Sequence, residues 1–223
     1  MKRRVLTALI AALLVIPAAA DEGLWLFNMP PKDILRAKYG FTVTPEFMDH
    51  LRLASISFGG ASGSFVSPDG LVLTNHHVGR GAVQNLSTKD RDLMKTGFYA
   101  RTRAEELKVP GMELRVLHGI EDVTDKVVEA EKPGMTPVEA ADARQKVIAG
   151  LEKETSEKTG LRAQVVTLYS GGMYHLYAYK VHRDVRLVFA PEYLVAFFGG
   201  DPDNFTYPRY DLDITLFRIY EDD

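Results

Sequence analysis

Two histidines stand side by side in the segment Thr74-Asn75-His76-His77, directly after a short apolar run. An imidazole titrates near neutral pH and passes protons in both directions, so a rigidly held histidine can act as a general base. Neighbouring side chains on a strand point to opposite sides, and at most one of the two faces a given cleft. We therefore expect one catalytic and one structural histidine. The alternative is that both are ordinary buried or surface residues.

A second segment with chemical potential is the polar and aromatic stretch 199–213, which carries four aspartates. Long ordered loops of this kind are often functional. Asp213 lies where this loop meets an apolar strand, and a buried carboxylate there can orient a histidine through Nδ1. Asp211 is the alternative for this role, whereas Asp201 and Asp203 fit the usual turn and cap positions of aspartate.

The composition argues against metal, thiol and nucleic-acid chemistry. Adjacent strand histidines diverge and cannot share one ion, and no close Asp/Glu–His spacing completes a ligand set. The chain has no cysteine, which excludes disulfides, cysteine-ligated zinc and a thiol nucleophile. Its net charge of −3 offers no basic surface for nucleic acid. We predict no metal, no cofactor and no nucleic-acid partner.

The elements that position these residues read mainly as strands. Alternating or apolar runs predict strands at 56–58, 64–67, 71–75, 114–117, 164–169, 173–181, 185–189 and 213–220. Ser67-Pro68-Asp69-Gly70 predicts a turn, because proline fixes one angle and glycine accepts a positive φ. This hairpin delivers the histidine pair to the end of a buried strand.

Helices interrupt the strands. A cap and first-turn proline at Thr44-Pro45 predict a helix to about residue 54, and a short helix is expected at 32–38. Residues 88–160 form a more helical excursion, in which Thr136-Pro137 opens a long charged helix that Gly160 ends.

The N-terminus is typical of a secretory signal. Four residues with three basic side chains precede the apolar run Val5–Ile16, and small residues lead to Ala20. The apolar run is short for a bilayer span, although an uncleaved anchor is the alternative. We expect a signal peptide at 1–20, a periplasmic or secreted protein, and no membrane association after cleavage.

Several segments resemble the bacterial dipeptidyl-peptidase 7 and 11 family of serine peptidases. The two long and specific ones are Gly63–His77 and the block 199–220; shorter ones lie at 23–25, 40–41, 49–55 and 184–188. The resemblance implies a chymotrypsin-like double β-barrel with a Ser-His-Asp triad. The fold class expected is therefore mainly β with helical insertions, a chymotrypsin-like β-barrel forming the N-terminal portion of a double-barrel serine peptidase.

The resemblance also implies roles for individual residues. His77 matches the general base, Asp213 the orienting aspartate, and Asn204 the residue that holds the free α-amino group of the substrate. Phe205 stands where several members carry tryptophan, and Val78 stands where many carry cysteine. Binding the amine fixes the distance to the scissile carbonyl, which explains cleavage two residues from the N-terminus.

The family places its nucleophile in a Gly-Asn-Ser-Gly-Ser type motif far downstream. Residues 21–223 are therefore expected to be the N-terminal part of the peptidase domain, without the second barrel and the inserted helical domain. The piece is expected to be inactive alone. Ser170 is followed by two glycines, as in trypsin-like nucleophile motifs, but its stretch matches a structural turn of the family.

The function expected is a secreted serine exopeptidase that releases dipeptides from peptides with a free N-terminus by acyl transfer. The full-length protein is expected to be able to form a homodimer. Side-chain specificity is not predicted. One alternative is a non-catalytic peptide-binding module or pseudoenzyme that uses Tyr174, Tyr177, Phe205 and Tyr207. Another is a different trypsin-like protease, such as a stress endoprotease, against which the Asp-Asn-Phe loop argues.

Overall fold

The computed structural model describes residues 23–200 and 206–221. The expected signal peptide and the candidates Asn204 and Phe205 lie outside the described residues. The chain divides into two compact units between Val43 and Thr44. The described part of the first unit holds helix α2 (Lys32–Tyr39), which follows Pro31 and ends at Gly40 with a left-handed φ of 65°.

The second unit is mainly β-structure with helices, as the sequence predicted. Its strands are β1 (Ser55–Ser57), β2 (Ser62–Phe65), β3 (Leu71–Thr74), β4 (Phe98–Tyr99), β5 (Leu107–Lys108), β6 (Leu114–Asp122), β7 (Arg162–Leu168), β8 (Met173–His182), β9 (Asp184–Ala190) and β10 (Thr215–Tyr220). Its helices are α3 (Pro45–Ala54), α4 (His76–Leu86), α5 (Leu93–Thr96), α6 (Thr124–Val128), α7 (Pro137–Thr159) and α8 (Tyr193–Ala196), with 3-10 turns η1 (Arg103–Glu105) and η2 (Tyr169–Gly171).

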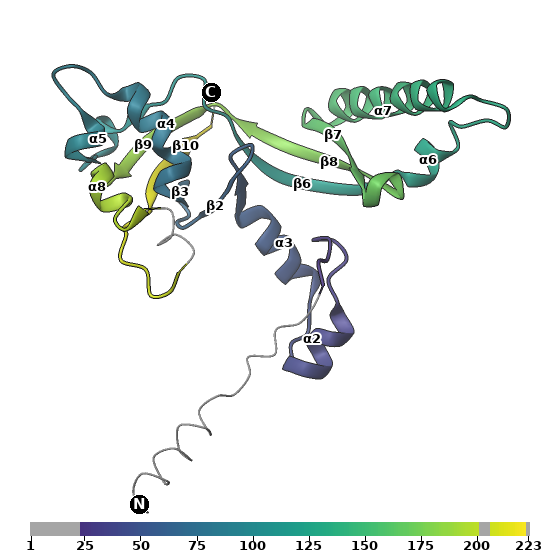
Figure 1. The fold of residues 1–223 in the computed structure, drawn as a ribbon, viewed down its shortest axis with the longest axis horizontal. Coiled ribbons are helices and arrows are strands. Elements are labelled where there is room, and N and C mark those ends of the chain that lie inside the picture. The colour runs from purple at the N-terminus through teal and green to yellow at the C-terminus, as the bar shows by residue number, and fades with distance from the viewer. Residues whose placement is uncertain (1–22, 201–205, 222–223) are drawn as a thin grey trace, which may run out of the picture. The chain divides into compact units, whose positions relative to one another are not determined.

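The strands form one antiparallel sheet in the order β4-β9-β10-β3-β2-β1-β6-β8-β7, with β5 also paired to β9. This path is open, since β4 and β7 are its ends, and among the described residues it is not the closed barrel that the sequence predicted. Only Arg183 separates β8 from β9, yet β8 pairs with β6 whereas β9 pairs with β10. The chain therefore changes strand partners between β8 and β9 and links two parts of the sheet (Figure 1).

The hairpin between β2 and β3 follows the predicted turn. Gly70 has a φ of 73°, which a residue with a side chain rarely adopts. The hydroxyl of Ser67 accepts hydrogen bonds from the backbone N–H groups of Asp69 and Leu71. A Cβ on Gly70 would lie 2.6 Å from the carbonyl oxygen of Ile219, so the turn also packs closely against β10. This turn fixes where β3 begins.

Helix α4 lies directly on the sheet because Gly79 has no side chain. A Cβ on Gly79 would lie 3.0 Å from Cγ2 of Thr215 and 3.1 Å from the ring of Phe217. Val83 on the same helix and Phe217 on β10 are fully buried in the main hydrophobic core. The close packing brings the first turn of α4 beside the start of β10.

The elements β7, β8, α6 and α7, called here the helical lobe, enclose a smaller core. Val123, Val127 and Leu176 are buried there, and α7 packs along β7 and β8 (Figure 1). Helix α7 begins after Thr136 and ends at Gly160, as the sequence predicted, and the structure adds a capping box between Thr136 and Glu139 and a left-handed conformation at Gly160. In the described part of the chain, no helix combines the length and apolar character needed to cross a bilayer.

Candidate active site

The histidine pair opens a helix and does not end a strand. The sequence predicted a strand through Asn75, but β3 ends at Thr74 and Asn75 is the N-cap of α4. Asparagine is among the preferred N-cap residues, although its side chain makes no capping hydrogen bond in this helix. Successive helical residues also diverge in direction, by about 100°. His76 is consequently buried, whereas half of the His77 side chain is exposed.

Sheet register brings His77 and Asp213 together. β10 pairs with β3 in antiparallel register, with Thr215 opposite Thr74. The residues that follow β3 and those that precede β10 therefore lie at the same end of the two strands. As a result, His77 and Asp213 meet although 136 positions separate them in the sequence.

The two side chains form a hydrogen-bonded pair. Nδ1 of His77 lies 2.7 Å from Oδ2 of Asp213, and the backbone N–H of His77 donates to Oδ1 over 3.0 Å. The carboxylate can only accept, so Nδ1 carries the ring proton in the neutral imidazole. Nε2 is then left as a proton acceptor, and no described residue forms a hydrogen bond with it. This is the arrangement that a general base requires.

Asp213 is a buried carboxylate that stays ionised. Only 6% of its side chain is exposed. Burial alone would raise the pKa of Asp213, but hydrogen bonds from the backbone and ring of His77 and from the Asn75 side chain outweigh it. The net result is a lowered pKa for Asp213. A permanent negative charge beside the ring stabilises the imidazolium that forms when His77 takes a proton.

His76 fills the structural role expected for one member of the pair. Its ring is buried, and its centroid lies 6.3 Å from that of Tyr193 on α8. Burial lowers the pKa of His76, and Arg80 and His77 lower it further, against the opposing effect of Asp213. Nε2 of His76 has no hydrogen-bond partner among the described residues. The His76 ring is therefore packed in the interior beside Tyr193.

Comparison with known proteins places the chain in a family. A sequence model of a protein family, described as Peptidase S46, matches residues 20–223. The chain belongs to the peptidase S46 family. This S46 chain is 36% identical to the dipeptidyl-peptidase 7 of Phocaeicola vulgatus, over 93% of this chain and 31% of that protein. It is 37% identical to the dipeptidyl-peptidase 7 of Porphyromonas gingivalis, over 99% of this chain and 33% of that protein.

A solved structure agrees with the sequence relatives. Porphyromonas endodontalis DPP11 in complex with the dipeptide Arg-Glu matches with a TM-score of 0.73 and 32% identity, over 91% of this chain and 32% of that chain. The resemblance drawn from the histidine and aspartate segments is thus confirmed. The S46 chain spans about a third of the length of the relatives that it matches.

Two site residues of the S46 chain escaped the sequence interpretation. Nδ2 of Asn75 donates to Oδ2 of Asp213 over 3.0 Å, and Nη2 of Arg209 lies 3.3 Å from the same oxygen. Arg209 also forms an ion pair with Asp211, the alternative orienting residue. The available signals were an N-cap asparagine before the histidines and an arginine among aspartates.

Other candidates lie elsewhere. Ser170 belongs to turn η2 between β7 and β8, where it adopts a left-handed φ of 55°. Tyr174, considered for a peptide-binding surface, is buried in the core of the helical lobe. Among the described residues, no group of three or more His, Cys, Asp or Glu side chains is arranged to hold a metal ion.

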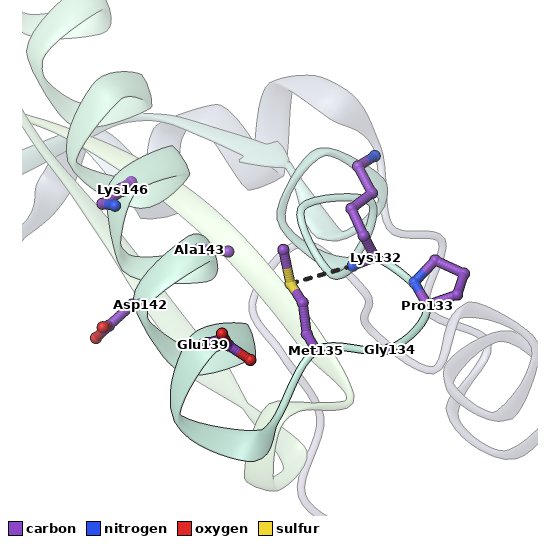
Figure 2. A pocket seen from close by; sticks show the side chains of 8 residues that line it. All are labelled: Lys132, Pro133, Gly134, Met135, Glu139, Asp142, Ala143 and Lys146. Carbon is purple, nitrogen blue, oxygen red and sulfur yellow. Dashed lines mark hydrogen bonds between the residues drawn. The ribbon is translucent and has the colours of Figure 1, made fainter.

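The helical lobe also contains a hollow of about 550 Å³ between the loop 132–135 and the first turns of α7. Figure 2 shows charged side chains of both signs around it, among them Lys132 and Asp142. Met135 packs across the loop, where its sulfur accepts a hydrogen bond from the backbone N–H of Lys132. Glu139 is engaged in the capping box of α7. None of the predicted site residues lines this hollow.

Proposed function

We propose that this chain belongs to a serine-type dipeptidyl-peptidase that releases dipeptides from peptides with a free N-terminus. The observation that carries the proposal is the contact between His77 Nδ1 and Asp213 Oδ2, with half of the His77 side chain exposed. The dipeptidyl-peptidases among the relatives support the choice of reaction. The nucleophile of this proposal is a serine beyond the described residues.

The proposed reaction is an acyl transfer in two steps. Nε2 of His77 takes the serine proton while the serine oxygen attacks the scissile carbonyl. The protonated ring then donates that proton to the leaving amine, and the dipeptide remains as an ester on the serine. In the second step, a water molecule gives a proton to His77 and adds to the ester as hydroxide. The dipeptide is then released and the serine oxygen regains the proton from His77. Asp213 keeps the ring in place and stays ionised throughout.

The same proposal extends to the surroundings of the reaction. Asn204 is assigned to the substrate α-amino group and Phe205 to the surface beside it, from their match to the family motif. The sheet is proposed to be related to the β-barrel of chymotrypsin-like peptidases. The support is that β8 and β9 follow each other almost without a break, while β8 pairs with β6 and β9 pairs with β10. Residues 1–20 are proposed as an export signal to the periplasm or exterior, and the full-length peptidase as a homodimer.

The test uses the complete gene product. Dipeptide release is measured from a peptide with a free N-terminus and from its N-acetylated form, for the wild type and for His77→Ala. We expect cleavage of the free peptide alone, and a loss of about 10⁴-fold or more in kcat for the variant. An unchanged rate in His77→Ala would overturn the base assignment. Equal cleavage of the acetylated peptide would overturn the assignment as a dipeptidyl-peptidase.

A further inference from the structure

Asn75 occupies the N-cap of α4 but does not cap the helix. Asparagine normally caps by accepting a hydrogen bond from the backbone N–H two or three residues later. In this chain the Asn75 side chain makes no such bond. Its Nδ2 instead donates to Oδ2 of Asp213 over 3.0 Å and to the backbone carbonyl of Asp213 over 3.2 Å.

Asp213 supplies the missing cap from a distant part of the sequence. Its Oδ1 accepts from the backbone N–H of His77, the second residue of α4. An N-terminal helix turn carries partial positive charge and unpaired N–H groups, so a carboxylate is well placed there. The two residues thus exchange functions: Asp213 caps α4, and Asn75 holds Asp213.

The exchange fixes both oxygens of the carboxylate. Oδ1 is tied to the main chain of α4, and Oδ2 accepts from the His77 ring and the Asn75 amide. Arg209 approaches the same oxygen at 3.3 Å, and the charge of Asp213 also acts on the pKa of the buried His76, which it raises against the effect of burial. Of these neighbours, Asn75 contacts both the side chain and the backbone of Asp213, so it restrains the residue at two points.

We propose that Asn75 is a positioning residue that fixes the Asp213 carboxylate against the His77 ring. The inference rests on the proposed function, because it assigns Asn75 a part in the same proton transfer. Asn75 acts through Asp213 and does not reach the substrate. Its loss would leave a buried carboxylate with one fewer donor and freedom to turn away from the ring.

The test compares two substitutions that cap a helix equally well. Asn75→Asp and Asn75→Ser are both good N-cap residues, so a purely capping Asn75 would tolerate either. Aspartate has no amide donor and places a second negative charge beside Oδ2, whereas serine keeps a hydroxyl donor. We expect kcat for dipeptide release to fall about 100-fold in Asn75→Asp and about 10-fold in Asn75→Ser, since hydrogen bonds to charged groups have effects of this size. KM should change less than about twofold, because ground-state binding is untouched.

The matched control is Thr44→Asp. Thr44 is a true N-cap, since its hydroxyl accepts from the backbone N–H of Phe47 in α3. This variant is expected to keep the wild-type kcat, and thermal unfolding of all variants checks the fold. If Asn75→Asp does not fold, Asn75→Ala replaces it in the comparison, because alanine also lacks a donor. The inference then predicts a lower kcat for Asn75→Ala than for Asn75→Ser. Folded Asn75 variants with the wild-type kcat would overturn this inference alone, whereas an inactive wild type would overturn the proposed function.

Discussion

Two histidine–aspartate pairs occur among the residues that the structure describes, and they bury opposite partners. At the end of β3, the carboxylate of Asp213 is 6% exposed and the His77 ring is 51% exposed, with a contact of 2.7 Å. In the helical lobe, the His175 ring is 1% exposed and the Asp122 carboxylate is 57% exposed, with a contact of 3.9 Å. The two pairs use the same residue types but bury opposite partners.

The difference shows what a base requires beyond the residue types. A buried carboxylate keeps its charge close to the ring, and an exposed ring edge can reach a substrate or a nucleophile. In the second pair, Asp122 is engaged by the hydroxyl and backbone N–H of Thr124, which hold the pKa of Asp122 low, with His175 as a lesser cause. Nδ1 of His175 is buried and has no hydrogen-bond partner in the part of the chain that the structure describes. The pair of His175 and Asp122 is therefore part of the packing near the start of α6. The pair of His77 and Asp213 is the candidate for catalysis.

The largest expected effect separates the two aspartates. Asp213→Asn should lower kcat for dipeptide release about 10⁴-fold, because an amide at this position favours the wrong tautomer of the base. Asp122→Asn should leave kcat within about twofold, since an exposed pair of this kind contributes little. Steady-state assays of the complete gene product decide between these outcomes. Similar losses in both variants would remove the distinction between the pairs.

A second prediction concerns stability in the helical lobe. Leu176→Ala should lower the free energy of unfolding by about 2–5 kcal/mol, because a buried leucine is replaced by a cavity. His175→Leu should change it by about 1 kcal/mol or less, because one buried nitrogen of the ring has no partner among residues 23–200 and 206–221, and leucine removes that penalty. Urea titration provides the measurement. A large loss in His175→Leu would mean that its contact with Asp122 stabilises the lobe.

The smallest effect is a pH dependence that originates in His76. Burial lowers the pKa of folded His76, whereas an unfolded histidine titrates near 6.5. Below that pH the unfolded chain binds a proton at His76 that the folded chain does not bind. The contribution of His76 to the free energy of unfolding is therefore fully present above about pH 6.5 and is lost as the pH is lowered. The contribution has a slope of at most about 1.4 kcal/mol per pH unit. Unfolding measured from pH 8 to pH 5 should be less pH-dependent in His76→Leu, and parallel curves would refute this prediction.

Local rules predicted much of the fold from the sequence. Three predictions were confirmed: the turn at Gly70, the cap at Thr44 and the positions where α7 begins and ends. Each of these features depends on residues that are neighbours in the sequence. Asp213 was also placed correctly at the entrance to an apolar strand. These features follow from short-range chemistry, which the sequence displays directly.

The start of α4 and the role of Asn75 were not predictable in the same way. Glycines at 79 and 81 lower helix propensity, which concealed α4 behind a strand-like apolar run. Gly79 is needed because α4 packs against Thr215, a residue of β10 far along the chain. The bond between Asn75 and Asp213 depends on the same long-range pairing. The asparagine before the histidines is a local signal for a helix start, but the contacts of α4 and of Asn75 with distant residues are tertiary and do not show in a local pattern.

The coupling of His77 to Asp213 can be measured with a double-mutant cycle. Values of kcat are determined for the wild type, His77→Ala, Asp213→Asn and the double variant of the complete gene product. If the carboxylate works only through the ring, the double variant is no slower than His77→Ala alone. If the two losses multiply in the double variant, Asp213 acts independently of His77, and the catalytic pair described for this chain does not exist.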